Sequence, residues 1–303
     1  MGAERHTIVG LGEILWDLFP DGTSQLGGAP TNFAYIASLL GEHAVVASRV
    51  GSDAPGEQAR NRLESLGLDI SFLQCDSSHP TGTVKVQVDR DGQPQFEIIQ
   101  SVAWDYLEWT PAWHTLARKA HAVCFSSLAQ RVFESRQTIR AFLRATGPHT
   151  VRVYDVNLRQ HFYSAEVIVE SLRCSDVVKL NHEELPRVMQ LLGLPHADDR
   201  SSAERLRSEY EVKLFSVTRG AHGSLLVSAN SCHEHQGFDV QVKDTVGSGD
   251  AFTAGLVYCY LRHASLPVIN EIANRLGAWV AGQKGGTPPA DMGLLRQLQN
   301  LLA

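Results

Sequence analysis

The pattern of apolar and polar positions along the 303-residue chain alternates between two periods. Short apolar runs, typical of buried strands, recur between stretches with the three-to-four-residue spacing of helices. The clearest helix is predicted for residues 30–40, where four apolar residues share one face and Gly41 follows as a stop signal. The predicted strands cover residues 7–9, 44–50, 122–126, 151–155, 177–180 and 214–218. This alternation predicts an α/β fold with a doubly wound, mostly parallel sheet and helices on both faces.

One region departs from this rhythm. Residues 81–88 read T-G-T-V-K-V-Q-V, so valines alternate with polar residues as in a strand with one wet face. Asp91-Gly92 has turn chemistry, and Phe96 and Ile98 predict a return strand. We expect a β-hairpin that projects from the main sheet and forms, with residues 13–28, a small β-sheet lid over a crevice. Because exposed strand edges need cover, the hairpin is also a candidate surface for a homodimer.

Composition and charge narrow the class of partner. The net charge is −6 and the pI is near 6.1, which argues against nucleic acid or anionic membranes as partners. The five cysteines form an odd count without a C-x-x-C pair, which indicates reduced thiols and a cytoplasmic protein. The N-terminal residues contain no apolar signal core, and no apolar run reaches the ~20 residues of a membrane span.

The most informative stretch is the glycine-rich turn of residues 242–255, which leads into an apolar helix. Gly247 and Gly249 permit backbone conformations that aim several N–H groups at one point, and the helix N-terminus adds a positive dipole end. Asp250 would compete with a bound phosphate for these donors, unless it accepts a proton from a hydroxyl that attacks the phosphate. The alternative is an ordinary helix N-terminus capped by Ser248 or Asp250.

Several other motifs are absent or incomplete. The chain has no G-x-x-x-x-G-K-[ST] run, no H-E-x-x-H and no G-x-S-x-G, and Gly10-x-Gly12 has Leu15 where a dinucleotide fingerprint needs a small residue. A dehydrogenase is therefore disfavoured. Cys232-His233-Glu234-His235 lacks the second pair of a zinc site and is predicted to be a hairpin tip. Residues 198–202 are predicted to be a solvated loop.

Five motifs, in order along nearly the whole chain, resemble those of the ribokinase-like (PfkB) carbohydrate kinases. They are L-G-G-A-P-T-N-F-A at 26–34, D-V-N-L-R at 155–159, N-H-E-E at 181–184, T-R-G-A-H-G-S at 218–224 and D-T-V-G-S-G-D-A-F at 244–252. The resemblance implies a ribokinase-like fold and transfer of the γ-phosphoryl group of ATP to a sugar hydroxyl. It divides the chain into an α/β nucleotide-binding core (1–12, 34–80 and 104–303) and a β lid with the sugar-side segment (13–33 and 81–103).

The same resemblance assigns roles to individual residues. Asp250 would be the catalytic base, and the N–H groups of Gly247, Ser248 and Gly249 would form the anion hole. Asn181 and Glu184 would organise Mg²⁺ through waters. The residues implied to lie along the nucleotide are Thr218, Gly220, Gly223 and Asn274. Asp244 and the backbone near Val246, Ala281 and Gly286 are implied, more weakly, to hold a monovalent cation such as K⁺.

Each of these motifs also has a purely structural interpretation. Asn181 and Glu184 could form a helix cap. Asp155, Asn157 and Arg159 could be a strand-end turn with a local ion pair, and the two glycines of 218–224 could belong to a hairpin. The five motifs together favour function.

The resemblance also implies that Asp17, Gly28 and Asn32 bind the sugar, because they match family positions that hydrogen-bond sugar hydroxyls. Ala29 replaces the lysine of the ribokinase subgroup, and the surrounding run resembles fructokinases, so fructose is the predicted substrate. Residues 100–105 contain no arginine, unlike many fructokinases and ketodeoxygluconate kinases, which weakens the assignment of the sugar and counts against an acidic sugar especially. The alternative sugars are 2-keto-3-deoxygluconate, ribose and tagatose. Trp104, in this stretch, is interpreted as core. A protein that kept the fold as a non-catalytic sugar or nucleotide sensor is the alternative from another class.

Overall fold

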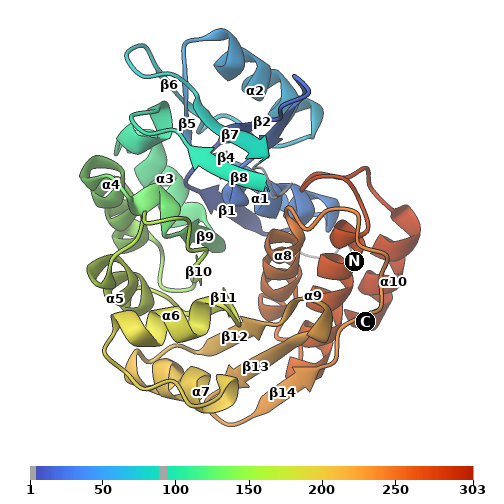
Figure 1. Ribbon diagram of the computed structural model, residues 1–303. Helices are drawn as coiled ribbons and strands as arrows, with labels where there is room; N and C mark the ends of the chain where they lie inside the picture. The colour runs from blue at the N-terminus through green and yellow to red at the C-terminus, as the bar shows by residue number, and fades with distance from the viewer. Residues whose placement is uncertain (1–4, 89–93, 303) are drawn as a thin grey trace.

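The computed structural model describes residues 5–88 and 94–302. At its centre lies a sheet in which eight strands are described, placed between two layers of helices (Figure 1). In spatial order the strands are β14 (Cys232–His235), β13 (Ser224–Ser228), β12 (Leu214–Thr218), β11 (Val177–Asn181), β10 (Val151–Asp155), β9 (Ala122–Ser126), β1 (Thr7–Leu11) and β4 (His43–Ala47). The strands from β12 to β4 run parallel, and β13 and β14 extend one edge as antiparallel neighbours. The predicted doubly wound α/β architecture is confirmed.

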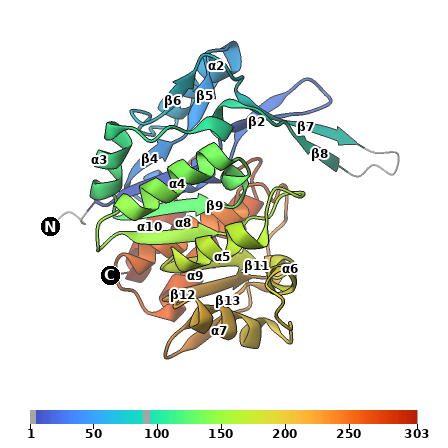
Figure 2. The same ribbon diagram turned by 90° about the vertical axis from the view of Figure 1, so that its left-hand side faces the viewer.

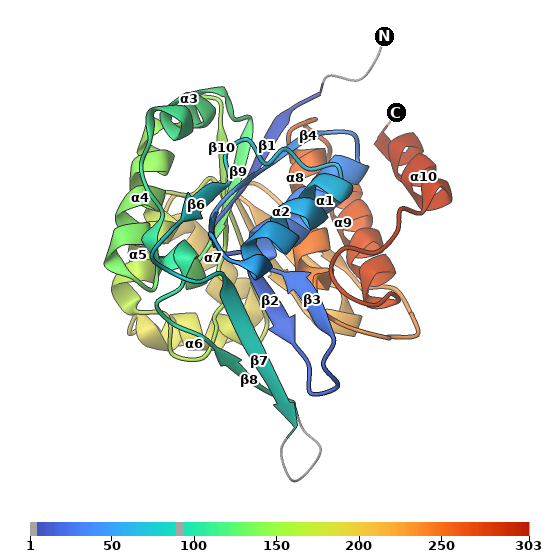
Figure 3. The same cartoon turned by 90° about the horizontal axis from the view of Figure 1, so that it is seen from above.

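Two hydrophobic cores lie on the two faces of this sheet, because successive strand side chains point to opposite sides. Val9 and Leu11 of β1 belong to one core and Ile8 to the other. The first core is covered by α3 (Pro111–Lys119), α4 (Phe133–Ala145), α5 (Ala165–Arg173), α6 (Glu184–Leu191) and α7 (Asp199–Glu209). The second is covered by α1 (Ala29–Leu39), α2 (Ala54–Ser65), α8 (Ser248–Tyr260), α9 (Leu266–Ala281) and α10 (Met292–Leu302). Figure 3 shows these two groups of helices on opposite sides of the sheet.

A second sheet stands at the carboxyl end of β1. Its strands, in spatial order, are β3 (Ser24–Gly27), β2 (Leu15–Leu18), β7 (Gly82–Val88) and β8 (Pro94–Ile98). Strands β7 and β8 pair antiparallel and extend beyond the body of the molecule (Figures 2 and 3). The predicted hairpin is therefore confirmed, while its Asp91-Gly92 turn lies outside the described residues. The proposed boundary between residues 33 and 34 falls inside α1, and the division into core and lid stays a prediction.

Three local predictions are wrong for physical reasons. The apolar run at 44–50 forms two strands, because the chain leaves the main sheet at Ser48 and β5 (Arg49–Gly51) pairs with β6 (Gln74–Asp76) instead. Residues 198–202 begin α7, with the Asp198 carboxylate accepting the Ser201 N–H as a cap. The segment 232–235 is the edge strand β14 and not a hairpin tip.

The helix predicted over residues 30–40 is confirmed as α1, and all five cysteines are free. Among the described residues, none of the helices combines the length and the apolar composition needed to cross a bilayer.

Candidate active site

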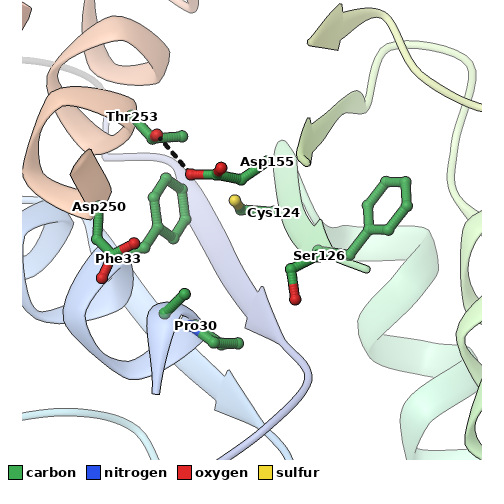
Figure 4. Close-up of a pocket in the computed structure, with 9 residues that line it drawn as sticks. Pro30, Phe33, Cys124, Ser126, Asp155, Asp250 and Thr253 are labelled. Atoms are coloured by element: carbon green, nitrogen blue, oxygen red, sulfur yellow. Dashed lines mark hydrogen bonds between the residues drawn. The ribbon is translucent and has the colours of Figure 1, made fainter. Parts of the chain in front are cut away.

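The predicted site residues come from segments that meet at the carboxyl ends of the parallel strands. β1 leads into Glu13, β10 ends at Asp155, and β11 ends at Asn181. The glycine-rich turn before α8 reaches the same edge, since α1 packs against both β1 and α8. Figure 4 shows Asp250 of α8 and Asp155 of β10 lining one small pocket together with Ser126 of β9. Such a strand edge is where open α/β sheets bind ligands.

The turn before α8 has the backbone that the glycines predict. Gly247 adopts a left-handed φ of 77°, and a Cβ atom there would lie 2.3 Å from the Gly286 Cα, so only glycine fits. Neither Ser248 nor Asp250 caps the helix, which excludes the simple capping interpretation. The Ser248 N–H donates to the Thr245 carbonyl at 3.2 Å. The first turn of α8 otherwise presents N–H groups that have no partner within the helix.

Asp250 links this helix to the sugar-side helix α1. Its Oδ2 accepts a hydrogen bond from Asn32 Nδ2 at 2.8 Å, across 218 residues of sequence. Burial and the neighbouring Asp155 carboxylate raise the pKa of Asp250 from its usual 3.8 to about 6. A carboxylate with this pKa is ionised at neutral pH and still basic enough to receive a proton from a hydroxyl.

The other predicted sugar-side residues lie close by. Asp17 is half-buried on β2, and burial together with Asp244 raises its pKa to about 6. Gly28 precedes α1 with a φ of 112°, and a Cβ there would lie 2.5 Å from the Glu13 carbonyl oxygen. The Asn32 Oδ1 atom is buried and has no partner among the described residues. A buried acceptor of this kind is free to receive a hydroxyl of a ligand.

Sequence reasoning missed Glu13 as a candidate site residue. The side chain is 2 % exposed and accepts a hydrogen bond from Ser126 Oγ at 3.2 Å. Burial, with the nearby Asp250 charge adding to it, raises the pKa of Glu13 to about 7. Arg159, exposed at this rim, lowers the pKa values of Glu13, Asp17 and Asp250 by its positive charge. The available signal was an acidic residue directly before the apolar pair 14–15.

Asn181 and Glu184 form the reciprocal pair of a capping box. The Asn181 Oδ1 accepts the Glu184 N–H at 2.8 Å, and Glu184 Oε2 accepts the Asn181 N–H at 2.8 Å. Glu184 Oε1 also accepts the Leu158 N–H at 2.7 Å. No group of three or more metal-ligating side chains is present in the described part of the chain. Both carboxylate oxygens of Glu184 and the Asn181 Oδ1 thus already accept backbone N–H groups, and the role of these two residues in organising Mg²⁺ through waters stays a prediction.

The predicted nucleotide residues gather around the hairpin of β12 and β13. Thr218 ends β12, and Gly220 and Gly223 flank the turn with φ values of 57° and 76°, so the hairpin interpretation is correct for the backbone. A Cβ at Gly223 would lie 2.0 Å from the His235 carbonyl oxygen, so packing explains this glycine. Asn274 donates its amide to Ser224 Oγ at 2.8 Å and to the Asn270 carbonyl at 2.7 Å. Contact of these four residues with a nucleotide stays a prediction.

The segments named for a monovalent cation meet around Asp244. Its two carboxylate oxygens accept the N–H groups of Val246 at 2.9 Å and Gly285 at 3.0 Å. The Ala281 carbonyl accepts the Lys243 N–H at 2.9 Å. The loop is thus held together by its own hydrogen bonds, and the cation stays a prediction.

Trp104 is confirmed as core, with no exposed surface. The Arg131 guanidinium lies 3.9 Å from its ring centroid and forms an ion pair with Asp105, with Arg131 Nε 2.7 Å from Asp105 Oδ1. The arginine nearest to this stretch is therefore engaged in the core.

Comparison with known proteins identifies the family. A model of the pfkB family carbohydrate kinases matches residues 17–292, and the chain belongs to this family of ATP-dependent sugar kinases. It is 31% identical to the fructokinase of Escherichia coli over 294 residues, which cover 91% of this chain and 93% of that protein.

Two solved structures share the fold. An uncharacterized sugar kinase from Pyrococcus horikoshii has a TM-score of 0.85 at 25% identity and covers 98% of this chain and 100% of its own. A fructokinase from Vibrio cholerae O395, solved with fructose, ADP and a calcium ion, has a TM-score of 0.81 at 25% identity and covers 97% of this chain and 98% of its own. The predicted family is thereby confirmed.

Proposed function

We propose that this protein phosphorylates fructose with ATP, and that Asp250 is the catalytic base. The observation that carries this proposal is the hydrogen bond between Asn32 and Asp250, which joins the sugar-side helix to the helix of the predicted anion hole. The similarity to fructokinases over nearly the whole chain supports fructose as the sugar.

The reaction follows from this arrangement. Asn32 engages Oδ2 of Asp250, so Oδ1 is the oxygen that receives the proton of the attacking hydroxyl. As that proton moves, the hydroxyl oxygen forms a bond to the γ-phosphorus, and the bond between this phosphorus and the β,γ-bridging oxygen breaks to release ADP. The N–H groups of Gly247 and Gly249, together with that of Ser248 once it leaves the Thr245 carbonyl, stabilise the charge on the transferred group.

Two ions accompany this proposal. When bound, Mg²⁺ neutralises charge on the phosphates, and Glu184 with Asn181 faces its waters. A monovalent cation such as K⁺ near Asp244 would add positive charge behind the glycine-rich turn. Thr218, Gly220, Gly223 and Asn274 are the proposed nucleotide contacts. Cytoplasmic location and a homodimer through the lid stay predictions.

The electrostatics of the sugar side favour a neutral sugar. Glu13, Asp17 and Asp250 carry acidic groups, whereas Arg159 is the cation that influences all three. An anionic substrate such as 2-keto-3-deoxygluconate would be repelled by these carboxylates. Fructose is uncharged, and carboxylates and amides bind its hydroxyl groups as acceptors and donors.

The test is ADP release from Mg·ATP with fructose, ribose, tagatose, 2-keto-3-deoxygluconate and adenosine, with Asp250→Asn beside the wild type. We expect fructose to give the highest kcat/KM and Asp250→Asn to lose about 10³-fold in kcat. Asp198→Asn, on the distant α7 cap, serves as the matched control and keeps wild-type turnover. Higher kcat/KM with another sugar would refute fructose, and a fully active Asp250→Asn would refute the base.

The pH profile supplies an independent check. Because the pKa of Asp250 is raised to about 6 and the base must be ionised, kcat/KM should rise tenfold per pH unit below about pH 6 and level above it. In Asp250→Asn the residual activity should lose this acid limb. A profile that stays flat down to pH 4.5 in the wild type would contradict the assignment.

A further inference from the structure

Lys179 is a buried cation that the mechanism above does not use. It lies on β11, its side chain is 9% exposed, and its Nζ is 3.1 Å from both carboxylate oxygens of Asp155 on the neighbouring strand β10. A buried ion pair is weak evidence for stability, because apolar residues of similar volume are often as stable or more so. Its position, therefore, needs another explanation.

The pair touches the first turn of α8. A Cβ atom at Gly249 would lie 3.0 Å from Lys179 Nζ, so the ammonium group packs directly against the backbone of the predicted anion hole. Thr253 Oγ1 donates to Asp155 Oδ2 at 3.1 Å, a bond drawn in Figure 4. The same hydroxyl lies 2.9 Å from the Gly249 carbonyl oxygen. Side chains of strands β10 and β11 therefore hold the first turn of α8 in place.

Two further carboxylates, besides Asp155, act on the charge of Lys179. Burial opposes its charge, but Asp155, Glu184 and Asp250 outweigh burial and keep the pKa of Lys179 above its ordinary value. In the reverse direction, its charge lowers the pKa values of Glu184 and Asp250. A fixed charge in a site of low dielectric acts strongly on the charge that develops during a reaction.

We propose that Asp155, Lys179 and Thr253 are positioning residues for phosphoryl transfer. Lys179 places a fixed positive charge beneath Gly249, where the transferred group gathers negative charge, and Asp155 with Thr253 holds the first turn of α8 in register with that charge. The inference rests on the proposed roles of Asp250 and the anion hole.

The principal test is the charge-neutral double variant Lys179→Met/Asp155→Asn. Removing both charges together leaves neither Lys179 nor Asp155 as an ion without its partner, so we expect unfolding by urea to remain near wild type. The kcat should nevertheless fall about 30-fold, because the charge beneath the anion hole is gone. Wild-type kcat in a stable double variant would overturn the proposal.

A second variant, Asp155→Asn alone, uses the pH profile of kcat as its readout. The charged groups that act on Asp250 are Asp155 on β10, Lys179 on β11, and Arg159 and Glu13 on the loops that follow β10 and β1. Removing the Asp155 charge leaves Lys179 unopposed, so the acid limb should move to lower pH. An unmoved limb would count against the proposal, and this variant decides it if the double variant does not fold.

The matched control lies on the same two strands. Arg152 and Asp176 form an ion pair at the opposite, amino ends of β10 and β11. Arg152→Met/Asp176→Asn should change stability and leave kcat and its acid limb unchanged. Asp250→Asn separates the two hypotheses: if it is fully active, the proposed base fails, whereas an inactive Asp250→Asn beside a fully active double variant refutes only the positioning role.

Discussion

The two edges of the main sheet, at the amino and at the carboxyl ends of its parallel strands, differ in how they treat buried carboxylates. At the amino ends, Arg152 donates its backbone N–H to Asp176 Oδ2 at 3.0 Å and its Nε at 2.9 Å, and Lys213 lies 3.0 Å from the other oxygen. Although burial acts to raise the pKa of Asp176, these hydrogen bonds hold it below the ordinary value. The ionised form is thus favoured there.

At the carboxyl ends, burial dominates. It raises the pKa of Glu13 to about 7 and the pKa values of Asp17 and Asp250 to about 6. Asp17 and Asp250 are ionised at neutral pH in the folded and in the unfolded chain, but burial makes their ionised forms less favourable in the folded protein, and Glu13 is partly protonated there. At the amino edge, the ionised carboxylate contributes to stability. At the carboxyl edge, the protein keeps carboxylates whose ionisation burial makes unfavourable, at the place where the phosphoryl transfer is proposed.

The largest effect on the carboxyl edge, after Asp250, is expected from Gly247→Ala. The alanine would be strained at a φ of 77°, and its Cβ would lie 2.3 Å from Gly286 Cα. We expect kcat to fall about 10²-fold, because the anion-hole donors shift. Gly193→Ala is the control, with a φ of 67° but no atom within 4 Å of the new Cβ. Equal activity of the two variants, measured by ADP release, would argue against the anion hole.

Glu13→Gln should stabilise the protein at alkaline pH. A raised folded-state pKa means that wild-type stability falls as pH rises from about 4.5 to about 7, while the amide loses nothing. The gain should be about 2 to 3 kcal/mol at pH 8 and should shrink markedly at pH 5. Urea unfolding at both pH values checks this, and a pH-independent difference would contradict the assigned pKa.

The smallest effect is expected at the amino edge, from Asp176→Asn. Its lowered pKa contributes stability above the usual Asp pKa of about 3.9, and that contribution disappears as pH falls further. We expect a loss of about 1 kcal/mol at pH 7, a difference that shrinks as the pH falls below the usual Asp pKa, and unchanged kcat. A clear drop in kcat would mean that the two edges are coupled, and the contrast between them would fail.

Much of the fold was predictable because it depends on local patterns. Three strands, β9, β10 and β12, have the predicted bounds, and the alternation of valines correctly marked β7. The run at 44–50 could not be divided from sequence, because apolar character indicates burial but not which strand will be the partner. The helix cap at Asp198 could have been predicted from the sequence, but the polar residues that follow it are also typical of a loop.

The candidate site also contains residues that the sequence alone identifies and residues that it does not. Gly247 could be recognised from the sequence, since its left-handed backbone conformation is favoured by glycine alone. Glu13 and Lys179 could not, because an acidic or basic residue in an apolar run acquires its role only from the groups that surround it in the fold. The bond between Asn32 and Asp250 joins two motifs that the sequence could name but could not bring into contact.

The sequence by itself therefore determined the family motifs, the helix and strand periods and the left-handed turn at Gly247. These features depend on neighbouring residues and on steric limits of the backbone. Only the tertiary structure decided that Lys179 lies beneath Gly249, that Glu13 is buried within reach of the Asp250 charge, and that Arg131 is engaged with Trp104 and Asp105. The physical reason is that strand order and burial set the distances and the desolvation of these charges, and neither quantity is local in sequence.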